Sequence, residues 1–161
     1  MGKPRLKPPS IFVIHASASY DTGTHIEDLM AERKRRNEGY NIIIDDESAP
    51  HDGKARLAQD APDGEVSNGT YGLNQEALNF CIDGDFRKVA PTPDEVDALV
   101  QAVAIKAKKF GWTAEYARTH IVTHNYVGLH LSPERYVTEC PGQMLIDLIP
   151  HIIKRVCSYL P

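Results

Sequence analysis

The sequence predicts an α/β protein in which a single mixed β-sheet is flanked by about three helices. Short apolar segments rich in β-branched residues alternate with longer segments whose apolar residues recur at helical spacing. The chain has 161 residues, of which 42% are hydrophobic and 25% charged, as in one globular domain. The expected element order, β-α-β-β-α-β-α, is typical of helices packed on the faces of one sheet.

The first half of the chain contains two predicted strands and one predicted helix. Residues 10–15 and 40–45 are short apolar runs of the kind that form buried strands. Between them, residues 24–27 have the spacing of a capping box, and Gly39 is a typical helix stop. Residues 46–76 are rich in Pro and Gly. We interpret them as a long loop that forms a wall of a functional site.

The second half contains two further strands and two further helices. Residues 77–83 and 119–124 are predicted strands. Residues 92–95 combine a Thr cap, Pro at the first helical position and a closing Glu, which predicts the start of a long helix. Apolar residues at helical spacing predict a last helix over residues 143–159, which Pro150 should kink or divide.

Charge and hydropathy exclude two classes of protein. The formal net charge is −4, which argues against a dedicated nucleic-acid binder. We interpret the dense basic run at residues 33–36 as a solvated helix face. The longest apolar runs, residues 11–14 and 42–44, are far shorter than the ~20 residues of a membrane span.

Residues 1–9 form a basic N-terminal extension before a single predicted domain at residues 10–161. The apolar run that follows the basic residues is shorter than the ~7–15 residues of a secretory signal core. We therefore expect the protein to be made in the cytoplasm without a signal peptide. We also expect it to be a monomer. If it acts on a cell wall, it must do so after release or delivery.

Three potential metal ligands stand at the ends of predicted elements: His15, His124 and Cys140. Two imidazoles and one thiolate would suit a catalytic zinc site, which keeps one position for water. An alternative is that Cys140 is a thiol nucleophile with His124 as its base. The other cysteines, Cys81 and Cys157, lie in apolar segments and are expected to be small core residues.

Several motifs occur in a recognisable order along the chain. They are Phe-Val-Ile-His-Ala-Ser at 12–17, Gly-Tyr-Asn-Ile-Ile-Ile at 39–44, the segment 74–86, Pro-Thr-Pro at 91–93 before a long helix, and Thr-Glu-Cys-Pro-Gly at 138–142. Together they resemble the zinc-dependent N-acetylmuramoyl-L-alanine amidases, a family that includes bacteriophage lysozyme-type amidases and animal peptidoglycan recognition proteins. The resemblance covers roughly residues 10–150.

The resemblance implies a role for each matching residue. His15, His124 and Cys140 would bind one Zn²⁺ per chain, and Tyr40 and Thr138 would stabilise the oxyanion. Thr138 occupies a position that is Lys in the phage members and Thr in the catalytic recognition proteins. A rough alignment adds three residues of a groove for the stem peptide: Arg56, Asn68 and Asn74.

The implied reaction is hydrolysis of the amide between N-acetylmuramic acid and L-alanine in bacterial peptidoglycan, as by a phage endolysin. An alternative is a non-catalytic peptidoglycan-binding module on the same fold, although such modules typically lack the Cys ligand. A second open point is the ligand histidine. His130 is closer to Cys140 and nearer the family's usual spacing, but His124 directly follows an apolar strand and is the ligand that we predict.

Overall fold

The computed structural model, which describes residues 2–18, 26–35, 39–45 and 55–161, contains a five-stranded mixed sheet of order β4-β3-β6-β2-β7. The strands are β2 (Ile11–Ala16), β3 (Ile42–Asp45), β4 (Arg56–Gln59), β6 (Ala77–Ile82) and β7 (Ile121–Thr123). Four of them run parallel, and β4 pairs antiparallel with β3 at one edge. The predicted α/β class with a mixed sheet is confirmed.

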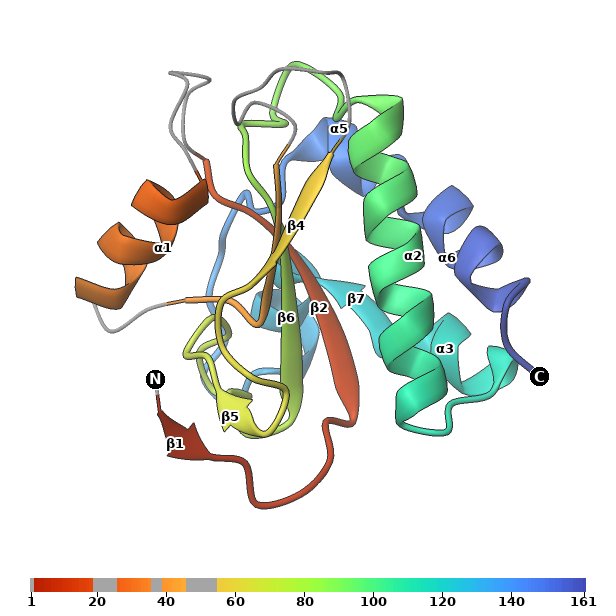
Figure 1. Ribbon diagram of the computed structural model, residues 1–161, viewed down its shortest axis with the longest axis horizontal. Coiled ribbons are helices and arrows are strands. Elements are labelled where there is room, and N and C mark those ends of the chain that lie inside the picture. The colour runs from red at the N-terminus through yellow and green to blue at the C-terminus, as the bar shows by residue number, and fades with distance from the viewer. Residues whose placement is uncertain (1, 19–25, 36–38, 46–54) are drawn as a thin grey trace.

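The two faces of the sheet are covered by different helices (Figure 1). Helices α2 (Pro93–Lys109) and α6 (Ile149–Cys157) cover one face, and α1 (Ile26–Arg35) lies on the other. Alternate residues of β2, such as Phe12 and Ile14, point into the main apolar core under α2. The remaining helical segments are short: α3 (Ala114–His120), α4 (His124–Tyr126), the π-helical turn η1 (Val127–Leu131) and α5 (Gln143–Ile146). Among the described residues, no helix is both long and apolar enough to cross a bilayer.

The predicted start of α2 and the predicted break near Pro150 are both confirmed. The Thr92 hydroxyl accepts a hydrogen bond from the Glu95 amide, and the Glu95 carboxylate accepts one from the Thr92 amide. Pro150 lies in the first turn of α6, so the expected helix over 143–159 is divided into α5 and α6. The capping box expected at 24–27 begins outside the described residues.

Two elements depart from the sequence prediction. The strand expected over 119–124 is limited to Ile121–Thr123, because helix α3 continues to His120. The Thr113 side chain caps the start of this helix. The segment 46–76 is not a single loop, since it contains β4 and the two-residue strand β5 (Glu65–Val66). β4 is a mostly exposed edge strand, so its sequence lacks the apolar alternation that signals a strand.

The solvated helix face predicted for residues 33–36 is wrong for Arg33. Its guanidinium donates a hydrogen bond to the Ser17 carbonyl at 2.9 Å and lies over the Tyr40 ring, 5.6 Å from the centroid. Met30, one helical turn earlier, packs against the apolar cluster that includes the same tyrosine. Arg33 therefore shares the face of α1 that contacts the sheet.

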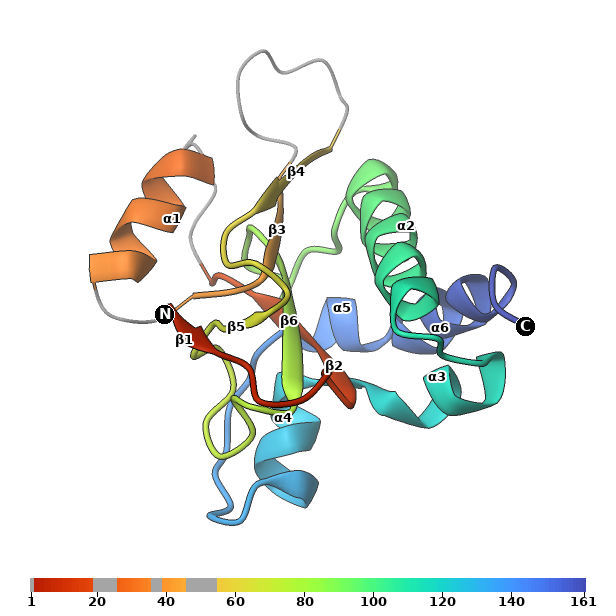
Figure 2. The same ribbon diagram turned by 60° about the horizontal axis from the view of Figure 1, so that its bottom comes forward.

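The predicted N-terminal extension is attached to the rest of the protein. Strand β1 (Lys3–Pro4) pairs antiparallel with β5, and the two lie side by side in Figure 2. The Arg5 guanidinium then donates hydrogen bonds at 2.6 to 3.4 Å to four backbone carbonyls, those of Asp63, Glu65, Asn74 and Gln75. Residues 3–5 thus stabilise the segment between β4 and β6.

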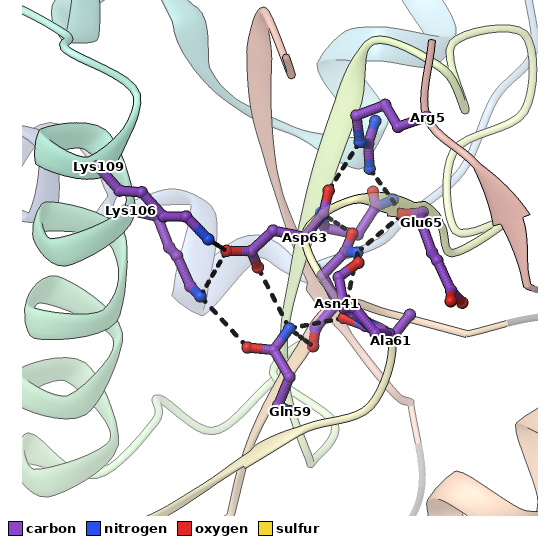
Figure 3. A network of polar contacts seen from close by, with 10 residues as sticks. Arg5, Asn41, Gln59, Ala61, Asp63, Glu65, Lys106 and Lys109 are labelled. Carbon is purple, nitrogen blue, oxygen red and sulfur yellow. Dashed lines mark hydrogen bonds and ion pairs between the residues drawn. The ribbon is translucent and has the colours of Figure 1, made fainter. Parts of the chain in front are cut away.

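Asp63 joins this segment to α2 (Figure 3). Its buried carboxylate accepts hydrogen bonds from Lys106 at 2.7 Å and Lys109 at 2.6 Å. Burial would raise the pKa of this carboxyl, but the hydrogen bonds and positive charges of the two lysines outweigh burial and lower it. The ionised form is therefore stabilised in the folded protein.

We expect Asp63→Asn to lower the free energy of unfolding by about 1.5–3 kcal/mol at pH 7, because it removes hydrogen bonds to charged groups. The folded pKa lies below the unfolded value, so this contribution is complete above pH ~4 and is lost as the pH falls through the folded pKa. Urea denaturation of both proteins at pH 7 and pH 3 measures the difference. Asp97→Asn, which breaks the exposed pair with Arg155, is the control and should cost less than ~1 kcal/mol. An equal loss in the two variants would contradict this account.

Candidate metal centre

The register of the parallel strands brings His15 and His124 to the same level of the sheet. Ile14 of β2 is paired with Thr123 of β7, so the residues that follow each of them, the two histidines, come level. Their ring centroids are 4.6 Å apart. The pairing of β2 with β7 thus brings together two histidines that are more than 100 residues apart in the sequence.

Cys140 is brought to the histidines by backbone hydrogen bonding. The amide of Asn125, the residue after His124, donates to the Cys140 carbonyl at 2.9 Å. The Cys140 sulfur also lies 3.4 Å from the Ala16 amide, which donates to it. The two ends of the segment 125–140 are therefore fixed beside the end of β2.

The three predicted ligands form one group. One donor atom from each of His15, His124 and Cys140 lies within 4.8 Å of the other two. His130 is outside this group, because its exposed ring packs on Tyr126 with centroids 4.6 Å apart. The geometry therefore favours His124 over His130 as the third member.

Burial keeps both imidazoles of this group neutral. Burial and the neighbouring His124 lower the pKa of His15 well below its ordinary value. Burial also lowers the pKa of His124 to about 4. At neutral pH each ring therefore has one nitrogen with an available lone pair, as metal coordination requires.

Cys140 is not arranged as an activated nucleophile. Burial raises the pKa of its thiol to about 11, whereas a catalytic thiolate needs a lowered pKa. The ring nitrogen near its sulfur is Nδ1 of His15, at 3.8 Å. This arrangement gives no support to the alternative of a thiol nucleophile with His124 as its base.

The donor set fits zinc. Two neutral imidazoles and one cysteine are ligands that zinc prefers, and three protein ligands leave one position of a tetrahedron for water. Ordinary Zn–N and Zn–S lengths at a tetrahedral angle separate the two donors by about 3.6 Å. The observed separation between Cys140 Sγ and His15 Nδ1, 3.8 Å, is close to this value.

The predicted catalytic residues Tyr40 and Thr138 both lie beside the group. Tyr40 lies two residues before the buried strand β3, and its ring centroid is 5.2 Å from that of His15. Burial, followed by the nearby Cys81, raises the pKa of Tyr40 well above its ordinary value. The Thr138 hydroxyl oxygen accepts a hydrogen bond from the Cys140 amide at 3.2 Å, so its proton is free to be donated elsewhere.

The three predicted groove residues are dispersed. Arg56 of β4 lies opposite Asp45 at the carboxyl end of β3. Three interstrand spacings separate β4 from β2, which places the Arg56 backbone roughly 14 Å or more from that of His15. Asn68 has a positive φ of 57°. The Asn74 side chain accepts a hydrogen bond from the Thr70 amide at 2.9 Å, which closes a turn. Their role in binding substrate stays a prediction.

Three residues near the group were not predicted from the sequence. Asn79 and Thr70 contact Nε2 of His15, and the Tyr136 hydroxyl contacts Nε2 of His124. A polar Asn in the middle of the apolar segment 77–82 was the available signal for Asn79, because a buried amide needs a partner. Tyr136 gave no comparable signal, since it lies in an irregular segment.

The structure is thus that of an α/β protein with a candidate metal site, a His-His-Cys group at the ends of the neighbouring strands β2 and β7. The chain belongs to the N-acetylmuramoyl-L-alanine amidase family, whose sequence model matches residues 5–143. The resemblance inferred from the motifs is thereby confirmed. A search of curated proteins gave no match.

Solved structures similar to this chain share its fold. The endolysin amidase LysCS of Clostridium intestinale is 19% identical, with a TM-score of 0.68 over 90% of this chain and 84% of that one. An endolysin from a Thermus scotoductus bacteriophage is 20% identical, with a TM-score of 0.65 over 93% and 88%. Drosophila peptidoglycan recognition protein SD is 18% identical, with a TM-score of 0.64 over 91% and 82%.

His124→Ala and His130→Ala should differ sharply in metal content. The first removes a donor of the group, so we expect loss of zinc from protein loaded with one equivalent and then dialysed. The second removes an exposed ring and should leave zinc binding unchanged. Metal analysis by mass spectrometry measures both. A zinc-free His130→Ala together with a zinc-loaded His124→Ala would reverse the assignment.

Proposed function

We propose that this protein is a zinc-dependent amidase that hydrolyses the bond between the lactyl group of N-acetylmuramic acid and L-alanine in bacterial peptidoglycan. The observation that carries the proposal is the convergence of His15, His124 and Cys140 in a chain of this family. These three residues would hold one Zn²⁺. Bound there, the ion would polarise the scissile carbonyl and lower the pKa of a water ligand to about 7.

The protein's own groups would stabilise the negative charge that develops on the carbonyl oxygen. Thr138 can donate its hydroxyl proton, because the amide of Cys140 already occupies its oxygen as acceptor. Tyr40 remains protonated at neutral pH because burial raises the pKa of its hydroxyl, so it acts as a hydrogen-bond donor. Neither donor is charged, in contrast to the lysine of phage members of the family.

We assign Arg56, Asn68 and Asn74 to contacts with the stem peptide. Arg56 lies opposite Asp45 at the carboxyl end of β3. Asn68 and Asn74 flank Thr70 in the sequence, and the Thr70 hydroxyl contacts His15. The biological setting that fits best is a monomeric phage-type endolysin, made in the cytoplasm and acting on the cell wall after release. Wall recycling and delivery as an antibacterial effector would use the same chemistry.

The competing proposal is a peptidoglycan-binding module without activity, because recognition proteins share the fold. Such modules typically lack the Cys ligand, whereas Cys140 is present here and faces His15. That contact favours the enzyme.

Digestion of purified sacculi tests the function. We expect the wild-type protein to release stem peptides with a free N-terminal alanine, which mass spectrometry identifies. EDTA should abolish release and added zinc should restore it, because the donor set needs the ion. Cys140→Ser should be inactive and Cys157→Ser, far from the group, active. Binding to sacculi without release would indicate the non-catalytic module, and release that survives EDTA would indicate the thiol enzyme.

Tyr40→Phe should fold and keep zinc but lose turnover by roughly 10²–10³-fold, the usual cost of one oxyanion donor. The ring still packs beside His15, so only the hydroxyl is removed. The initial rate of peptide release at saturating sacculi measures the loss, and thermal unfolding of the same sample verifies the fold. Unchanged turnover would make Tyr40 a packing residue only.

A further inference from the structure

In both histidines of the candidate metal centre, Nε2 has a side-chain partner. The Nε2 atom of His15 lies 2.8 Å from Oδ1 of Asn79, while its Nδ1 faces Cys140. The Nε2 atom of His124 lies 3.1 Å from the hydroxyl of Tyr136. In each ring Nδ1 is therefore the atom available for a metal.

A chain of buried amides determines which atom of Asn79 faces His15. The side-chain Nδ2 of Asn41 contacts backbone carbonyls between residues 61 and 65, so its Oδ1 must face the opposite way. There Oδ1 accepts hydrogen bonds from the Asn79 amide and from the Ser67 hydroxyl, both at 3.0 Å. Because Ser67 donates its only proton to Asn41, its oxygen accepts from Nδ2 of Asn79, at 2.8 Å.

The orientation of Asn79 then determines the tautomer of His15. With Nδ2 bound to Ser67, Oδ1 of Asn79 points to His15 and can only accept. The Thr70 hydroxyl donates to the same oxygen. Nε2 of His15 must therefore carry the proton, and Nδ1 keeps its lone pair toward Cys140.

Two glycines allow the side chains behind the histidines to come this close. A Cβ on Gly69 would lie 3.0 Å from Cγ of Asn79 and 2.7 Å from the Gly39 carbonyl oxygen. A Cβ on Gly128 would lie 2.7 Å from the Tyr136 ring and 2.5 Å from its carbonyl oxygen. Backbone hydrogen bonding also fixes Tyr136, whose amide donates to the Gly128 carbonyl at 3.0 Å.

We propose that Asn79 and Tyr136 are positioning residues that fix the two histidines with Nδ1 toward the metal. This rests on the proposed zinc-dependent function. A ligand histidine usually donates its other N–H to an acceptor, and removal of that acceptor typically lowers metal affinity 10–100-fold. Both partners here are uncharged. The amide oxygen of Asn79 can only accept, and the Tyr136 hydroxyl would accept from Nε2–H of His124 when Nδ1 binds the metal, so both orient the rings without adding negative charge to the site.

The test measures zinc dissociation constants by competition with a chromophoric chelator. Asn79→Leu and Tyr136→Phe each remove one acceptor and should raise the dissociation constant about 10–100-fold. Asn79→Asp keeps an oxygen toward His15 and should recover most of the affinity. Tyr116→Phe is the matched control, because it removes a hydroxyl bonded to the Ser10 carbonyl, away from the metal centre, and should leave the affinity unchanged.

Two further readouts separate positioning from stability. Tyr136→Phe should unfold at the wild-type temperature when zinc-free, because its ring still packs on Gly128. The visible absorption of the Co²⁺-loaded variants should shift from that of the wild type, since the orientation of a ligand changes. If Asn79→Leu fails to fold, the zinc dissociation constants of Tyr136→Phe and Asn79→Asp test the proposal.

The outcomes distinguish this inference from the function on which it rests. Unchanged zinc affinity in Asn79→Leu and Tyr136→Phe, with a wild type that binds zinc and cleaves sacculi, would overturn the inference alone. A wild type that binds zinc without cleaving would overturn the function, while weakened binding in the two variants would still support the inference. A wild type that does not bind zinc would overturn both.

Discussion

Buried polar groups need hydrogen-bond partners, and the side chain of Asn41 meets that need for both a loop and a strand. It is fully buried between the sheet and the segment at residues 61–65, and its Nδ2 contacts carbonyl oxygens of that segment. An unpaired buried polar group costs roughly 1–3 kcal/mol. By bonding these carbonyls on one side and Asn79 on the other, Asn41 makes a loop and a strand depend on each other.

The parallel sheet provides the second constraint. Strands that run in the same direction end at one edge, so His15 near the end of β2 and His124 just after β7 meet there although they are far apart in the sequence. The face opposite α2 is available for polar groups because the main core occupies only the other face. His15, Asn79 and Cys81 all point to that face, since β2 and β6 pair His15 with Cys81 and side chains alternate along each strand.

Local signals were enough to predict the features that depend on one segment. The capping box at Thr92 and the apolar strands β2, β3 and β6 were predicted, because capping and hydropathy are local. The members of the metal centre were found through the motifs around them. Strand β4 and the inward direction of Arg33 were missed, because each depends on contacts with distant parts of the chain. Helix α3 was missed although its Thr113 cap is a local signal. The contact between Tyr136 and His124 depends on how segment 125–140 folds back, which no pattern of residues expresses.

That segment leaves the metal centre and returns to it at nearly the same place, because the Asn125 amide is bonded to the Cys140 carbonyl. The entropic cost of closing such a loop grows slowly with length, by only about 0.6 kcal/mol for each doubling. The spacing between two ligands is therefore a poor guide to whether they belong to one site. It also makes this segment a place where evolution can insert residues and reshape the surface around the candidate metal centre while His124 and Cys140 keep their positions.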